Sequence, residues 1–429
     1  MRLQHSFATT LILCATLALS AGRIASAAPP ADPASPAGTP PGAATPAPAP
    51  PAPVRVDARA QYPAFLRNSY FDFNVGTIRY LFSAQQLEPG FQAQSTEIPH
   101  LAARVDLFGH QFLPHLAAQV VYLRPARYVT YTNVNGDGGR HQVSEAIGAV
   151  TLVSSWSLTR RVSVYGEGGY GITSRGGIRI NGQTVVKDAR FGAALLGAGF
   201  AYHLTPNVDL LLSATYSPGR RGLDQPSTRL FTTGFRYHML PLSAAKVEAS
   251  REAAFFFPAN VVRLGLSSGA PGYGANSFFS SVVPIFWNGR VRADRGVTVD
   301  YQHNVFHTRK RFAFDLGASV SSWTSTGGET FRTLSVYPLL RFMLVRTRPA
   351  DVYATYSLAG PTYLNRSLVD GHALGARFEF QDAMAVGAFL GARRRLNVEI
   401  GIKHYSNGNI FPQNAAIAIP VTLTVGLAF

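Results

Sequence analysis

Alternating apolar and polar residues, in segments of about ten, run through most of this chain and restrict its fold more than any other feature. The C-terminal residues show the pattern most clearly: Val421, Leu423, Val425, Leu427 and Phe429 alternate with Thr422, Thr424, Gly426 and Ala428. Because the side chains of a β-strand point alternately to its two faces, each such segment predicts a strand with one apolar face. Strands of this length can cross a membrane as parts of a β-barrel.

The composition favours a membrane barrel over a soluble protein. Charged residues make up 14% of the 429 residues, whereas soluble proteins have about 25%. Aromatic residues make up 11% of the chain, and there are 40 glycines. Beyond the N-terminal segment, no apolar stretch reaches the roughly 18 residues that a membrane-spanning helix needs. A soluble β-sandwich also alternates, but it does not require low charge, an export signal and aromatic strand ends together.

The N-terminus has the features of an export signal. Arg2 precedes a short apolar run (7–19), and the small residues 25–27 fit a cleavage site, so residues 1–27 are predicted to be a signal peptide. Residues 28–60 are mostly alanine and proline and predict a semi-rigid linker without a core. The expected location is the bacterial outer membrane.

The remaining chain divides into two runs of strands separated by a short break. The first run contains eight candidate strands near residues 69–82, 99–109, 114–130, 142–158, 161–175, 190–204, 207–217 and 227–240. We therefore expect an all-β fold with two antiparallel transmembrane barrels of about eight strands each, at 61–240 and 259–429. The linker 241–258 between them includes a predicted short helix at 242–254. A single barrel of about sixteen strands is the alternative that periodicity leaves open.

The charge of the chain indicates what it meets in the membrane. The formal net charge is +16, and loss of Arg2 and Arg23 with the signal peptide leaves 16 − 2 = +14. A basic excess suits phosphate-rich surfaces, and for an exported barrel these are lipids rather than nucleic acid. Cys14 is the only cysteine and lies in the predicted signal peptide, so the exported chain has no disulfide or thiolate chemistry. A homodimer is left open.

A serine and a histidine near the C-terminus stand out chemically. His404 and Ser406 are two residues apart, so in a strand both side chains leave the same face. That face also carries Val398, Ile400 and Ile402 and is therefore predicted to face lipid. A hydroxyl beside an imidazole is the minimum of an activated serine nucleophile. The sequence thus suggests an esterase-like site for a substrate that is itself apolar.

The residues around this pair resemble the lipid A 3-O-deacylase family (PagL-type, acyloxyacyl hydrolase-like). The matching runs are Phe378-Glu379-Phe380-Gln381-Asp382, Leu396-Asn397-Val398-Glu399-Ile400-Gly401-Ile402-Lys403-His404-Tyr405-Ser406-Asn407-Gly408 and Pro412-Gln413-Asn414. The resemblance is sharp only near the C-terminus. The N-terminal half instead resembles a generic OmpA-type outer-membrane barrel.

The resemblance implies a metal-free and cofactor-free serine esterase of the outer membrane, acting on lipopolysaccharide. It would remove the acyl chain ester-linked at the 3-position of lipid A. Ser406 would be the nucleophile and His404 its base. Asn407, Gly408 and Asn414 would hold the loop or stabilise the oxyanion. Lipid A and outer-membrane lipids are the expected partners.

The acidic residue that orients the histidine in this family is absent from its usual place. No Asp or Glu follows Ser406, and counting from either end of the motif places Ala418 or Ile419 there. Asp382 is a candidate substitute because it is expected on the outer face, whereas Glu399 should point into the barrel. An acid from elsewhere, a slow dyad and an inactive site remain open, since an orienting carboxylate can be worth about 10⁴ in rate.

Two other interpretations are kept in view. The chain is alternatively a structural or small-solute outer-membrane barrel that retains only a degenerate deacylase site. His303 and His307 share one strand face, but no further ligand has suitable spacing, so no metal site is predicted.

Overall fold

A computed structural model of the chain describes residues 58–282, 289–411 and 413–429. The predicted signal peptide (1–27) and Pro412 lie outside the described residues. The same holds for the Ala/Pro-rich linker, except for its last residues, which form the 3₁₀ turn η1 (Ala58–Ala60).

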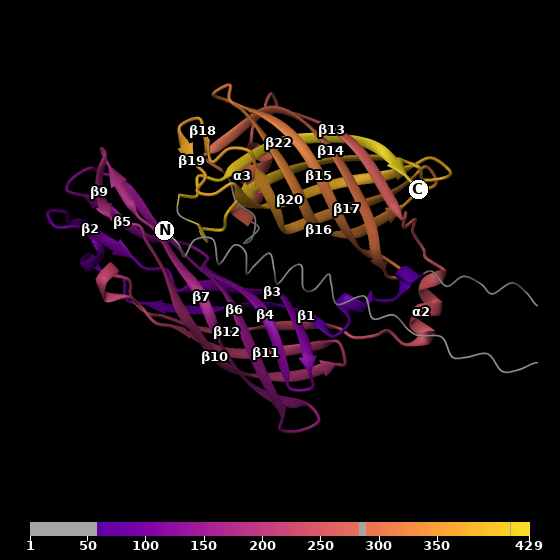
Figure 1. Ribbon diagram of the computed structural model, residues 1–429, viewed down its shortest axis with the longest axis horizontal. Coiled ribbons are helices and arrows are strands. Elements are labelled where there is room, and N and C mark those ends of the chain that lie inside the picture. Colours follow the sequence, from indigo (N-terminus) through magenta and orange to yellow (C-terminus); the bar gives the residue numbers. More distant parts are fainter. Residues whose placement is uncertain (1–57, 283–288, 412) are drawn as a thin grey trace, which may run out of the picture.

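Two closed antiparallel barrels of eight strands each form the body of the protein (Figure 1). The first contains β1 (Ser69–Tyr80), β3 (Leu101–Leu113), β4 (Leu116–Pro125), β6 (Arg140–Ser157), β7 (Val162–Gly176), β10 (Ala189–Thr205), β11 (Val208–Ser217) and β12 (Thr228–Met239). The second contains β13 (Asn260–Ser268), β14 (Val291–His307), β15 (Phe312–Ser325), β16 (Thr330–Arg346), β17 (Ala350–Leu364), β20 (Phe378–Leu390), β21 (Leu396–Ser406) and β22 (Ile417–Ala428). The prediction of an all-β fold with two barrels is confirmed, and the single sixteen-stranded barrel is excluded.

Short helices and strands lie at the ends of the barrels and in the segment that connects them. Between the barrels lies α2 (Ala244–Arg251), inside the segment predicted to be helical, with the Ser243 hydroxyl accepting from the Lys246 N–H at its start. The others are η2 (Ala64–Leu66), η3 (Ala84–Gln86), β2 (Ala93–Glu97), β5 (Val129–Val134), β8 (Ile178–Ile180), β9 (Gln183–Val186), η4 (Arg221–Leu223), α3 (Gly274–Val282), β18 (Leu368–Val369) and β19 (His372–Ala373).

The outer surfaces of both barrels are apolar and their lumens are polar. Leu212 of the first barrel and Leu427 of the second are 59% and 62% exposed, whereas the lumenal Glu167 and Asp300 are buried. This arrangement is the reverse of a soluble protein and matches barrels embedded in lipid, so the chain is an outer-membrane protein. Among the described residues, no helix combines the length and apolar character needed to span a bilayer.

The two ends of each barrel differ in the length of their connections. Short turns, such as 114–115 and 206–207, join strands at one end, and longer segments, such as 81–100 and 365–377, join them at the other. Outer-membrane barrels have short periplasmic turns and longer extracellular loops. The long-loop end of both barrels is therefore the extracellular end.

Buried ion pairs fill the lumen of the first barrel. The guanidinium of Arg104 donates to both carboxylate oxygens of Glu167, at 2.6 and 2.7 Å, and to Asp106 at 3.0 Å. All three side chains are almost completely buried. Because an isolated charge in such a place is strongly unfavourable, the three groups depend on one another.

Replacing Arg104 by methionine should lower the unfolding free energy of the first barrel by about 3–5 kcal/mol, because two buried carboxylates lose their cation. Urea unfolding of the lipid-reconstituted protein measures the change. Arg140→Met is the matched control: its pair with Glu97 is 64% and 55% exposed, and such a pair is worth at most about 1 kcal/mol. Equal effects of the two substitutions would contradict the prediction.

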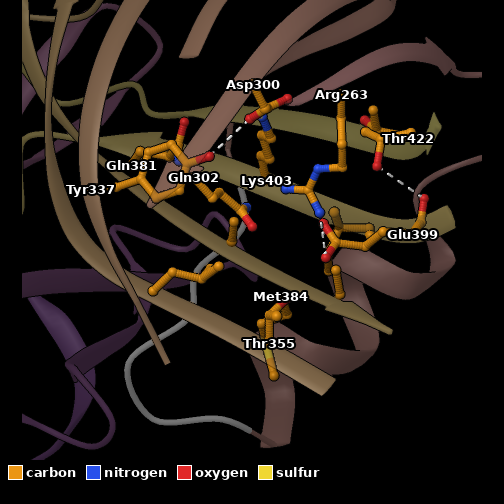
Figure 2. Close-up of a pocket in the computed structure, with 16 residues that line it drawn as sticks. Arg263, Asp300, Gln302, Tyr337, Thr355, Gln381, Met384, Glu399, Lys403 and Thr422 are labelled. Carbon is orange, nitrogen blue, oxygen red and sulfur yellow. Dashed lines mark hydrogen bonds and ion pairs between the residues drawn. The ribbon is translucent and has the colours of Figure 1, made fainter. Parts of the chain in front are cut away.

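The lumen of the second barrel holds a cavity of about 30 Å³ among paired charges (Figure 2). Figure 2 shows Arg263 beside Glu399 and Lys403 near Asp300. The nitrogen–oxygen distances of these two ion pairs are 2.7 and 3.3 Å. A cavity of this size holds roughly two water molecules. It cannot take an acyl chain, so a lipid substrate has to bind outside the lumen.

Candidate active site

His404 and Ser406 lie on the outward face of β21, near its extracellular end. Their lumenal neighbours on the same strand, Glu399 and Lys403, pair with charges inside the barrel. The alternation along the strand therefore places the pair on the outer face, as predicted from the sequence, and Glu399 points inward, also as predicted.

The site is nevertheless not open to lipid in the way the sequence suggested. Ile400 is 52% exposed, but Ile402, His404 and Ser406 along the same face are 4%, 0% and 7% exposed. The expectation of a lipid-exposed pair is therefore corrected. The first barrel reaches this part of the site: the Tyr122 hydroxyl donates to the carbonyl oxygen of Gly408, two residues after Ser406, at 3.3 Å.

Asp382 on β20 lies directly across from His404 on β21 in the strand register. Its Oδ2 is 3.5 Å from His404 Nδ1, an ion-pair distance that is long for a hydrogen bond. Its Oδ1 accepts a hydrogen bond of 2.8 Å from the backbone N–H of Ala359. The geometry thus brings the candidate substitute acid to the histidine.

The Ala359 N–H is free for this contact because β17 bulges there. The register between β17 and β20 shifts between Ser357 and Gly360, and Ala359 has φ +53°. A bulge leaves a residue out of the ladder, so its N–H can turn to a side chain. Sequence reasoning missed this group, because the donor is a backbone N–H and every residue type except proline has one.

The strand on the other side of His404 offers no acid. Ala418 of β22 is its partner there, and the register slips between Gly401 and Lys403, which accommodates Pro420. Ile419 pairs with Lys403 and is likewise apolar. On β22, where the resemblance to the family predicts the acid, the neighbours of His404 are therefore apolar. The carboxylate that approaches His404 comes from Asp382 on β20, the strand on its other side.

Two donors point at the hydroxyl oxygen of Ser406. The backbone N–H of Gly408 donates to Ser406 Oγ at 3.1 Å, and the side-chain amide of Asn414 donates to it at 2.9 Å. The Asn414 amide also donates to Asn409 Oδ1 at 3.0 Å, and its carbonyl oxygen accepts from the Asn407 N–H at 3.3 Å. Asn414 therefore links the end of β21 to the loop that follows it.

That loop is a tight turn whose sequence explains its shape. The N–H of Ile410 donates to the carbonyl oxygen of Asn407 at 3.0 Å, and both central residues, Gly408 and Asn409, have positive φ, +61° and +59°. Positive φ at both positions is the mark of a type I′ turn, which favours Asn and Gly. The Asn407 side chain is anchored separately, donating to the Leu374 carbonyl at 3.0 Å. Of the predicted supporting residues, Gly408 and Asn414 therefore contact Ser406 Oγ, whereas Asn407 holds the turn from Leu374.

A second serine–histidine–aspartate chain lies in the first barrel and provides an internal comparison. Ser163 Oγ is 2.8 Å from His203 Nε2, and His203 Nδ1 is 2.7 Å from Asp209. The other oxygen of Asp209 is 2.7 Å from His238. Ser163 points into the lumen at the periplasmic end, so we interpret these hydrogen bonds as a structural network. Short serine–histidine–aspartate distances are therefore not sufficient to define an active site.

Metal ligands are not gathered anywhere in the described ranges: no three His, Cys, Asp or Glu side chains form a group that could hold an ion.

The sequence comparisons identify one family. Residues 288–418 match the family model described as lipid A 3-O-deacylase (PagL), a range that includes β14 to β21 and the residues around Ser406. No curated protein matches the chain.

Several solved outer-membrane barrels are similar in structure, each over about one barrel. The outer-membrane enzyme PagL is 16% identical, with 40% of this chain and 100% of that chain covered and a TM-score of 0.28. The N-terminal barrel domain of Pseudomonas aeruginosa OprF is 14% identical, with 40% and 98% covered and a TM-score of 0.26. Neisserial surface protein A is 15% identical, with 40% and 96% covered and a TM-score of 0.27.

Proposed function

Since the C-terminal region carries a lipid A 3-O-deacylase (PagL) domain, we propose that the chain is an outer-membrane serine esterase that removes the 3-O-linked acyl chain from lipid A. The observation that carries the proposal is the convergence of three groups on one outer face. Ser406 receives two N–H donors, and His404 lies two residues away on the same strand with the Asp382 carboxylate across from it.

The reaction follows the general logic of an activated serine. His404, with Nδ1 directed to Asp382, uses Nε2 to take the proton of Ser406 as Oγ attacks the ester carbonyl. The tetrahedral intermediate collapses and releases the 3-hydroxyl of the sugar, which takes the proton back from His404. Water activated by the same imidazole then hydrolyses the acyl-serine ester and releases the fatty acid.

The donors at Ser406 are suited to the charge that develops during attack. The Gly408 N–H and the Asn414 amide lie about 3 Å from Oγ, next to where the carbonyl oxygen of a bound ester would become an oxyanion. A single donor of this kind typically lowers the barrier by about 3–4 kcal/mol. Asn407 acts indirectly by anchoring the turn.

The place of the site also fits the substrate. Ser406 lies at the extracellular end of β21, on the outward face of a barrel whose lumen is filled with paired side chains. At that level of the membrane the sugar of a glycolipid meets its acyl chains. An ester bond at this boundary lies level with Ser406, although with Ser406 only 7% exposed it has to enter past the side chains that surround the pair.

Mass spectrometry of lipid A from cells that express the chain tests the proposal. We expect lipid A to lose one 3-hydroxyacyl group relative to cells with an empty vector. A lipid A whose primary chains are all amide-linked should stay unchanged, because it lacks the 3-O ester that the proposal makes the substrate. Unaltered lipid A in cells with correctly inserted protein would favour the alternative, a non-catalytic barrel with a degenerate site.

A further inference from the structure

The first barrel packs its outer wall against the turn that follows Ser406. A cluster of three residues on this wall makes the contact: Tyr122 on β4, Gly148 on β6 and Arg190 on β10. The strands β4 and β6 are neighbours, and β7 joins β6 to β10 in the barrel order. The three residues therefore form one continuous patch near the extracellular end, which we term the seam patch.

Each residue of the seam patch meets a different part of the turn. The hydroxyl of Tyr122 donates to the carbonyl oxygen of Gly408 at 3.3 Å. Gly148 lacks a side chain where the Ile410 side chain approaches, and a Cβ there would lie 3.4 Å from it. The guanidinium of Arg190 lies 5.3 Å from the centre of the Phe411 ring, a cation–π distance.

The backbone group that Tyr122 contacts is one peptide unit away from the N–H that donates to Ser406 Oγ. The Gly408 carbonyl accepts from Tyr122, and the Gly408 N–H donates to Ser406 Oγ. Gly408 has φ +61°, a conformation it can leave easily because glycine has few steric limits. A hydrogen bond that holds its carbonyl therefore helps to fix the direction of its N–H.

A second contact at the other end of the barrels limits their relative motion. Tyr62, which precedes the first barrel, stacks on Phe306 of the second at 4.2 Å, and its hydroxyl lies 2.9 Å from that of Tyr237. Figure 1 also shows the long-loop ends of both barrels on the same side, with β2, β5 and β9 of the first barrel and β18 and β19 of the second, as a shared bilayer requires. The first barrel is thus placed to support the site rather than to touch it by chance.

We infer that the first barrel is a working part of the active site, and that Tyr122 is a positioning residue that acts on Ser406 through Gly408. The inference rests on the proposed function. It also gives the first barrel a role that the sequence did not suggest: it is the second wall of a site whose chemical groups all come from the other barrel. The ester must then enter along the seam between the two barrels.

Steady-state kinetics of the full-length protein with 3-O-acylated lipid A in detergent test the positioning role. Tyr122→Phe keeps the ring and removes only the hydroxyl, so kcat should fall about threefold to tenfold with KM unchanged, as expected for one lost hydrogen bond. Tyr170→Phe is the control, because Tyr170 of the same barrel is 58% exposed on the lipid face and should leave kcat unchanged. An unchanged kcat for Tyr122→Phe would overturn the inference. A higher kcat would also overturn it, because the first barrel would then block access to Ser406 instead of positioning it.

Cross-linking tests the seam without any reference to activity. A variant with Gly148→Cys and Ile410→Cys should be joined by a short thiol cross-linker in outer membranes, detectable as one linked peptide pair by mass spectrometry. The only natural cysteine, Cys14, lies in the predicted signal peptide and does not interfere. The pair Leu212→Cys with Ile410→Cys should not be joined, because Leu212 is 59% exposed on the lipid face of β11, a strand that is not part of the seam patch.

The two measurements separate this inference from the proposed function. An active wild type without the cross-link would overturn the seam while leaving the esterase intact. An inactive wild type with the cross-link would remove the esterase and, with it, the positioning role of Tyr122. Cross-linking together with a lower kcat for Tyr122→Phe supports both.

Discussion

Ser406→Ala should abolish deacylation of lipid A, lowering kcat by about 10⁴-fold or more, because no other group forms the bond to the acyl carbon. Mass spectrometry of lipid A from cells expressing the variant should then match cells without the protein. Folding should be retained, since the alanine keeps the strand and loses only a hydroxyl that accepts two hydrogen bonds. Heat modifiability on gels checks that the variant is inserted.

Ser163→Ala is the matched control for this substitution. Ser163 also lies beside a histidine that meets an aspartate, and the histidine–aspartate distance there is shorter, 2.7 Å against 3.5 Å at His404. We expect it to leave deacylation unchanged, because it faces the lumen of the first barrel. Loss of activity with Ser163→Ala and retention with Ser406→Ala would move the chemistry to the other barrel and contradict the assignment.

Asp382→Asn should lower kcat by about 10²- to 10⁴-fold while leaving the barrel folded. The carboxylate stabilises the imidazolium that forms when His404 takes the serine proton, and the neutral amide does so poorly and also favours the wrong tautomer. Glu379→Gln is the control on the same strand: Glu379 is completely buried but its position alternates inward, so the same carboxylate-to-amide change should not affect kcat. Discontinuous assays of fatty-acid release by the purified proteins measure kcat for both variants.

The family position of the acid provides a rescue for that experiment. Ala418 flanks His404 from β22, opposite Asp382 on β20. Adding Ala418→Glu to the Asp382→Asn variant should therefore restore part of the lost rate by supplying a carboxylate from the other side. Full activity of Asp382→Asn by itself would show that the histidine and serine work as a dyad.

The sequence alone determined the architecture and the face on which the chemistry lies. A strand repeats every two residues, and this local rule predicted all eight strands of the first barrel and the outward direction of His404 and Ser406. The turn at Gly408 and Asn409 also depends on local sequence, because glycine and asparagine are the residue types that adopt positive φ most readily. The short strands β2, β5, β8 and β9 were missed, since they belong to loops whose pairing depends on the barrel beneath them.

Only the tertiary structure decided what surrounds the catalytic pair. The approach of Asp382 to His404 depends on the register of β20 with β21 and on the bulge at Ala359, and register is set by residues far apart in the chain. The hydroxyl that holds the Gly408 carbonyl belongs to Tyr122 of the first barrel, which precedes Gly408 by nearly 300 residues (|i−j| = 286). The alternation along a strand predicts the face on which a side chain lies, but it does not predict which other part of the protein will pack against that face.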